Sequence, residues 1–177
     1  MKKLSIYVSF SLFAVSCLVN ASEQEVAPTL SFVKAIPPDV AKHLTGDGYK
    51  LFPQRKFISW DEGGKHYLIM LRDKGDGCGV VDFNETNDDY SIVDSFDRCK
   101  VVSYPIIKDL VGDGSQAIVV RLRVHSNGAA DVDVNHTSAY LYVPESKKFC
   151  KNEDAGNFAS GVRVPNSVIK FGSSTCY

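Results

Sequence analysis

The segment Ala117-Ile118-Val119-Val120-Arg121-Leu122-Arg123-Val124 is the strongest strand pattern in the chain. It is rich in β-branched residues, and polar and apolar residues alternate in its second half, which is typical of a strand with one buried face. Short runs of the same character lie on both sides of it, separated by turns rich in Gly, Asp and Asn. These runs are Leu30–Val33, Lys56–Trp60, His66–Arg72, Gly79–Phe83, Tyr90–Val93, Val101–Ile107, Ser138–Val143 and Ser167–Phe171.

The number and spacing of these runs predict an all-β fold, with antiparallel sheets in a propeller-like or sandwich-like arrangement. At most one short helix is expected, over residues 37–44, because proline favours the first turn of a helix. No stretch of linker composition interrupts residues 30–177. We therefore expect a single disulfide-braced, β-rich domain over residues 30–177, preceded by a loosely ordered segment at residues 22–29.

Residues 1–21 have the pattern of a secretory signal peptide. A basic start precedes an apolar run that is too short to span a membrane, and the run ends at the small-residue cleavage pattern Val19-Asn20-Ala21. Cys17 follows a sequence similar to a bacterial lipobox, so a lipid anchor there is the alternative to removal with the signal peptide. We expect an exported protein in the periplasm, with an extracellular location as the alternative, and no membrane span.

The charge balance disfavours nucleic acid as a partner. Without Lys2 and Lys3, the chain holds 18 Lys and Arg residues against 21 Asp and Glu residues. Binding to phosphates requires clustered basic residues on a positively charged surface. The basic residues Arg121, Arg123 and His125 alternate along the strongest strand, and we interpret them as a solvated strand face.

Four cysteines remain after the expected signal peptide: Cys78, Cys99, Cys150 and Cys176. In an exported protein an even number of cysteines indicates disulfides, here two, and three pairings are open. Proximity along the chain favours Cys78–Cys99 and Cys150–Cys176, but the sequence does not decide among the pairings. No C-x-x-C spacing occurs, which disfavours a zinc site and thioredoxin-like chemistry.

Turns rich in Gly and Asp suggest calcium as a ligand to be considered. The loop Asp109-Leu110-Val111-Gly112-Asp113-Gly114 lies between two predicted strands, where its carboxylates can converge on a cation. Calcium takes six to eight oxygen ligands, and the loop offers two carboxylates, so we favour a turn that keeps its shape without an ion. Calcium held by Asp109 and Asp113, with Asp73 and Asp76 as further ligands, is retained as an alternative.

This loop resembles the FG-GAP/VCBS-like repeat, the strand-loop-strand calcium unit of integrin-type propellers. Asp109, Gly112, Asp113 and Gly114 match its D-x-N-G-D-G core, and an apolar strand follows. Val111 stands where the repeat has Asn, and Ala117 where it has a closing Asp. A second, degenerate copy begins at Asp61, 48 residues upstream, a spacing that suits a propeller blade. The resemblance implies a propeller-type fold.

A second motif extends the resemblance. The segment Ala139–Phe149, followed by Lys151-Asn152-Glu153-Asp154, resembles the strand-turn-strand pattern of small exported bacterial proteins. Relatives with this layout include periplasmic immunity proteins, which inhibit peptidoglycan-cleaving toxins. The resemblance covers residues 50–171 and implies a secreted toxin or cell-wall hydrolase as the partner. It supports the fold more directly than the function.

A loop near the strongest strand is the best candidate for binding. Residues 126–130 are small and polar, as expected of a protruding tip between two strands. Alternation along the following extended segment places Asp131, Asp133 and Asn135 on one side. We therefore predict a partner-binding surface made of Ser126, Asn127, Asp131, Asp133, Asn135 and His136.

The function expected from the sequence is that of a binding protein. The four His residues lie outside metalloprotease motifs, and neither a nucleophile elbow nor a P-loop occurs. We expect an immunity protein or inhibitor that blocks a secreted toxin or cell-wall hydrolase by loop insertion or active-site occlusion, without a catalytic residue or cofactor of its own. The alternatives are a calcium-dependent adhesion or scaffold module and a glycan or peptidoglycan hydrolase that uses Asp131, Asp133 or His136.

Overall fold

A computed structural model describes residues 27–54, 56–73, 75, 77–126, 132–171 and 174–176. The predictions for the signal peptide at residues 1–21, for Cys17 and for residues 22–26 lie outside these residues. Asp76, Asn127 and Asp131 also lie outside them, and the side chain of Ser126 is not described.

The first sheet has six strands in the order β1-β3-β4-β5-β6, with β2 paired to β4. Its strands are β1 (Ser31–Val33), β2 (Lys50–Leu51), β3 (Phe57–Asp61), β4 (Lys65–Arg72), β5 (Cys78–Asn84) and β6 (Asp89–Phe96). All pairs in it are antiparallel. Alternation along β4 places apolar residues on both faces, so the sheet is buried on two sides.

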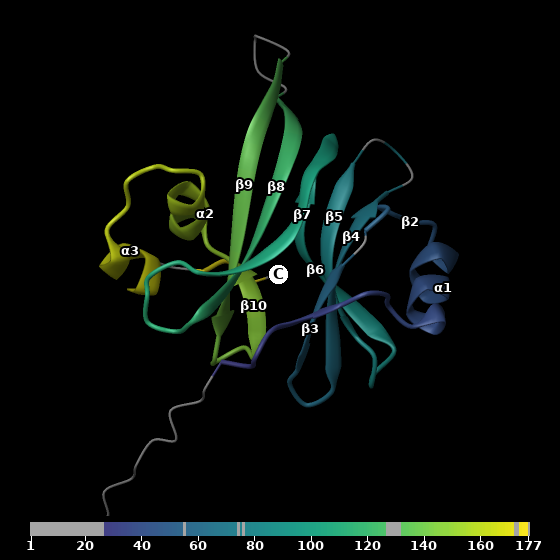
Figure 1. The fold of residues 1–177 in the computed structure, drawn as a ribbon. Helices are drawn as coiled ribbons and strands as arrows, with labels where there is room; N and C mark the ends of the chain where they lie inside the picture. Colours follow the sequence, from purple (N-terminus) through teal and green to yellow (C-terminus); the bar gives the residue numbers. More distant parts are fainter. Residues whose placement is uncertain are drawn as a thin grey trace, which may run out of the picture.

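The second sheet has four antiparallel strands in the order β10-β9-β8-β7. They are β7 (Cys99–Asp109), β8 (Gln116–Ser126), β9 (Val132–Val143) and β10 (Lys148–Lys151). Figure 1 shows this sheet beside the first, with β7 nearest to it. The strongest strand pattern in the sequence is β8, and the predicted all-β fold is confirmed.

A shared core joins the two sheets. Trp60 and Met70 from the first sheet meet Leu122, Tyr140 and Phe149 from the second, and all five are at most 2% exposed. The indole of Trp60 packs edge-on against the Phe149 ring, with 5.0 Å between ring centroids. The two sheets therefore belong to one packed unit.

The two sheets share one arrangement of strands. Each contains a four-stranded meander, β3 to β6 and β7 to β10. The first turn of each meander starts at an aspartate, Asp61 or Asp109. In the last hairpin of each, one residue other than glycine has a positive φ, 49° at Asp88 and 54° at Lys147.

Equivalent strands present opposite faces to the shared core. Ile69 in β4 lies in an outer cluster, whereas the residue at the equivalent place in β8, Val120, lies in the shared core. Likewise Phe83 in β5 points outward, and its counterpart Tyr142 in β9 packs against the shared core. The two sheets therefore contribute differently placed strand faces to the shared core.

Three short helices cover the outer faces, where at most one was predicted. Helix α1 (Pro38–Gly46) lies over the first sheet, and α2 (Glu153–Ala159) and α3 (Asn166–Phe171) lie over the second (Figure 1). Asn152 caps α2 by accepting a hydrogen bond from the Ala155 amide at 2.8 Å.

The prediction of a strand at Ser167–Phe171 was wrong, because this segment is helix α3. The amides of Val168 and Ile169 donate to the carbonyl of Pro165. Ile169 is 1% exposed and packs in the cluster between the helices and the second sheet. A five-residue segment with three apolar residues does not distinguish a strand from a short helix that docks on a sheet.

Two disulfides form, Cys78–Cys99 and Cys150–Cys176, the pairing that proximity along the chain favoured. The first joins the beginning of β5 to the beginning of β7 and so connects the two sheets covalently. The second ties the C-terminal segment to β10. Structural disulfides indicate an oxidising compartment and hence export.

Candidate binding surface

The hairpin of β8 and β9 extends past the neighbouring strands at one end of the molecule (Figure 1). These strands have 11 and 12 residues, whereas the equivalent strands β4 and β5 have 8 and 7. The predicted binding loop is the connection between β8 and β9. Of its predicted residues, Asp133, Asn135 and His136 lie fully within the described part of the chain.

The register of the hairpin separates these three residues. Asp133 lies opposite His125 and Asn135 opposite Arg123, so the two polar residues share one face. The carboxylate of Asp133 lies 3.1 Å from Nδ1 of His125. His136 lies on the other face, opposite Leu122, and points toward the inter-sheet core. The structure therefore supports Asp133 and Asn135 as neighbours but assigns His136 to a different environment.

His136 belongs to a buried polar cluster between the sheets. Its Nε2 atom is 3.1 Å from the Ser138 hydroxyl, which donates to Asp94 at 3.0 Å. Asp94 also accepts a hydrogen bond from Tyr140 at 3.1 Å and pairs with Lys151 at 3.4 Å. Burial, followed by the nearby Lys151 charge, lowers the pKa of His136.

This cluster does not have the geometry of a hydrolase active site. In a catalytic triad the histidine lies between the nucleophile and the acid. Here the Ser138 hydroxyl lies between His136 and Asp94, and Ser138 is 1% exposed. A substrate cannot reach this hydroxyl, so the cluster stabilises the contact between the sheets.

The loop from β7 to β8 uses its aspartates to bind its own backbone. The Asp109 carboxylate accepts hydrogen bonds from the amides of Val111, Gly112 and Gly114 at 3.2, 2.7 and 2.9 Å. The bond from Gly114 is the main cause that lowers the Asp109 pKa. Asp113 accepts a hydrogen bond from the Ser115 amide at 2.9 Å. These contacts explain how the turn keeps its shape.

Asp73 has the same role in the turn between β4 and β5. Its Oδ1 atom accepts hydrogen bonds from the amides of Gly75 and Gly77 at 2.8 and 3.1 Å. Among the described residues, no group of three or more His, Cys, Asp or Glu side chains is arranged to hold a metal ion. The predicted ligands Asp73, Asp109 and Asp113 therefore lie in separate turns stabilised by their own amides.

A cationic cleft lies at the base of the projecting hairpin, and the sequence analysis missed it. Its volume is about 280 Å³. Four cations line it: Arg72 from β4, Arg98 and Lys100 on either side of Cys99, and Arg123 from β8. The pair of His125 and the predicted binding residue Asp133 completes the lining. Within the described part of the chain, none of the four has a carboxylate within ion-pair distance.

One sequence signal could have identified the cleft. Two of its cations, Arg98 and Lys100, flank a disulfide cysteine, and the sheet then places Lys100 opposite Arg123. We interpreted Arg123 and His125 as a solvated strand face, but both line the cleft. The contribution of Arg72 comes from the other sheet and cannot be read from local sequence.

Comparisons of the chain with protein-family models, with curated proteins and with solved structures found no match. No helix in the described ranges is both long and apolar enough to cross a membrane.

Proposed function

We propose that this protein is a periplasmic inhibitor of the immunity-protein kind, which blocks a secreted toxin or cell-wall hydrolase through its β8–β9 hairpin. The observation that carries the proposal is the lengthened hairpin that extends past the rest of its sheet (Figure 1). A rigid scaffold with a projecting loop is a common arrangement for binding. Export, indicated by the disulfides, supports a partner outside the cytoplasm.

The hairpin offers both apolar and charged contacts. Val132 and Val134 are 46% and 42% exposed, near the tip of β9. The cations Arg98 and Arg123 lie at its base. Glycan-cleaving enzymes carry paired carboxylates in their clefts. We expect the hairpin to enter such a cleft and the basal cations to increase the rate of association with an acidic rim.

The proposal is tested with the oxidised protein as bait in a lysate of its own organism. Any captured enzyme is then assayed for peptidoglycan cleavage with and without the inhibitor. We expect stoichiometric inhibition, which Val134→Asp weakens by at least about tenfold, or 1.4 kcal/mol. Val162→Asp is the matched control, because Val162 is 54% exposed and lies between α2 and α3.

Two results would count against the proposal. A captured enzyme that cleaves peptidoglycan equally well in the presence of the protein would exclude inhibition. Full inhibition by both Val134→Asp and Asp133→Lys would exclude the hairpin as the inhibitory element, since these changes introduce a buried charge or reverse a charge at the proposed contact.

A further inference from the structure

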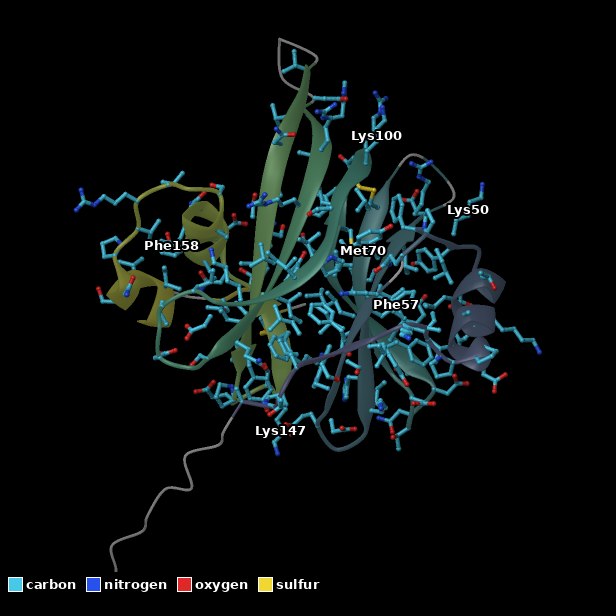
Figure 2. The ribbon with its side chains drawn as sticks, viewed as in Figure 1. Lys50, Phe57, Met70, Lys100, Lys147 and Phe158 are labelled. Carbon is cyan, nitrogen blue, oxygen red and sulfur yellow. A yellow bond between two sulfur atoms is a disulfide. The ribbon has the colours of Figure 1, made fainter. Side chains whose placement is uncertain are left out.

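A second groove continues from the cationic cleft along the edge of the second sheet. Its volume is about 380 Å³, and it shares Arg72 and Lys100 with the cleft. One side is the edge strand β7, with Val101, Ser103 and Tyr104. The other side is the segment after β2, with Phe52, Pro53 and Gln54. Figure 2 shows Lys100 at the end of the molecule from which the hairpin projects.

Two polar atoms in this groove are buried without a hydrogen-bond partner in the described structure. They are the Nε atom of Arg72, a donor, and the Oε1 atom of Gln54, an acceptor. Buried polar atoms of native proteins are almost always hydrogen-bonded, so each such atom requires an explanation. Both atoms belong to residues that line the same groove, whereas the third such atom among the described residues, Nε1 of Trp60, lies in the core between the sheets.

The surrounding contacts hold these two side chains in place. Gln54 donates through Nε2 to the Met70 carbonyl at 3.2 Å, which leaves its Oε1 atom for another partner. The Arg72 guanidinium lies over the Phe52 ring, 5.4 Å from its centroid. Arg72 also lies opposite Cys78 in the ladder, and the Cys78–Cys99 disulfide then fixes it relative to Lys100. The site is therefore preorganised by the bond between the sheets.

We propose that this groove binds a peptide that ends in a free carboxylate. The carboxylate accepts hydrogen bonds from Arg72 and pairs with Lys100, because a guanidinium and a carboxylate match in geometry. The N–H of the terminal residue donates to Gln54 Oε1. Its side chain packs on Phe52 and Tyr104, which provide the apolar surface of the groove. One terminal residue supplies all three contacts, which is a recurring mode of peptide capture.

The test titrates the oxidised full chain with N-acetyl-Ala-Ala and, as a matched ligand, with its C-terminal amide, followed by amide chemical shifts. We expect saturable shifts around the groove with a dissociation constant on the order of 1 mM, as expected for a ligand of this size. The amide should bind at least about tenfold more weakly, because it lacks the charge that Arg72 and Lys100 recognise.

Two variants and one control locate the site. Arg72→Gln and Lys100→Gln should each weaken binding of the free acid by about tenfold or more. Lys100 is exposed, so its variant retains the fold if Arg72→Gln does not. Lys65→Gln removes the same charge from the opposite end of β4, outside the groove, and should leave binding unchanged.

Three outcomes would overturn the proposal: no saturable shift up to about 10 mM, equal binding of the acid and the amide, or equal binding of inorganic phosphate, which would indicate a general anion site. Val134→Asp lies on the hairpin and should not affect peptide binding. The peptide titration and the inhibition assay can therefore fail independently.

Discussion

The two meanders share a design but differ in where they are elaborated. The first, β3 to β6, keeps short hairpins and buries a His66–Asp82 pair, with 2.7 Å between Nδ1 and the carboxylate. The second, β7 to β10, has the lengthened hairpin, the Asp109 loop and two covering helices. The comparison teaches that sheets of the same strand order differ in their additions, since the longer hairpin and the covering helices α2 and α3 are found in the second.

The largest effects are expected from removing two buried carboxylates, Asp94 at the contact between the sheets and Asp82 within the first sheet. Asp94→Ala should destabilise the fold by about 3 kcal/mol, because it leaves the buried hydroxyls of Ser138 and Tyr140 without their acceptor and Lys151 with only the exposed Glu153 as a partner. Asp82→Ala should cost about 1–2 kcal/mol less, because its partner His66 can lose its proton and become neutral. Urea unfolding of the oxidised variants measures both values. Equal costs would show that the contact between the sheets, where Asp94 lies, and the interior of the first sheet, where Asp82 lies, tolerate the loss of a buried carboxylate equally.

Substitution of two helical glycines tests how closely the covering helices pack on the sheets. A Cβ atom added at Gly156 in α2 would lie 2.6 Å from the Thr137 carbonyl of β9, so Gly156→Ala should destabilise by about 1–3 kcal/mol. Gly46 in α1 has no atom within 4 Å of an added Cβ. Gly46→Ala should therefore stabilise by about 0.5–1 kcal/mol. Thermal unfolding separates the two, and a stabilising Gly156→Ala would contradict the close packing of α2 on β9.

The two inner histidines should give opposite pH dependences. Burial lowers the pKa of His66, but the hydrogen bond and charge of Asp82 outweigh it and raise the pKa above the ordinary value of 6.5. The contribution of protonated His66 to the free energy of unfolding is full below about pH 6.5, and it is lost as pH rises through the raised pKa. His136 has the reverse effect because its pKa is lowered. The contribution of neutral His136 to stability is full above about pH 6.5, and it is lost as pH falls through the lowered pKa.

Single variants should reveal these two contributions. In His66→Gln only His136 remains of the pair, so the free energy of unfolding should increase with pH between about pH 5 and 8. In His136→Gln it should decrease over the same range. Urea unfolding at several pH values provides the measurement, and wild type should lie between the two. Slopes of the same sign in both variants would exclude these assignments.

The sequence predicted the elements with strong alternation and the fold class well. β8 and the Asp109 turn are recognisable because their patterns are local, with alternating residues in one and an aspartate followed by glycines in the other. The segment Ser167–Phe171 was misassigned because its helical form depends on docking against the second sheet. Tertiary contacts of this kind override local pattern.

The surroundings of the proposed binding residues could be read from the sequence only in part. Alternation along the strand predicted that Asp133 and Asn135 share one face, and the register confirms this. The burial of His136 on the other face depends on packing between the sheets, which local sequence does not show. The groove at Arg72 and Lys100 joins residues of two sheets, and only the disulfide and the strand order bring them together.

The smallest effect is expected from calcium at the β7–β8 turn. The Asp109 carboxylate already accepts hydrogen bonds from three loop amides, and these bonds lower its pKa. Adding about 5 mM calcium in place of a chelator should therefore change the Tm by less than about 1 °C. A site filled at 100 times its dissociation constant would add about 2.7 kcal/mol, a shift of several degrees for a domain of this size.

The variant Asp109→Ala distinguishes a self-stabilised turn from a metal site. If the carboxylate serves the backbone alone, the variant should lower the Tm by the same amount with calcium and with chelator, because the lost bonds are those to Val111, Gly112 and Gly114. If calcium raises the Tm of wild type by several degrees and the gain disappears in Asp109→Ala, the turn is a cation site. The second meander would then differ from the first in metal binding as well as in its hairpin, and the calcium-dependent module would become the better account of this sheet.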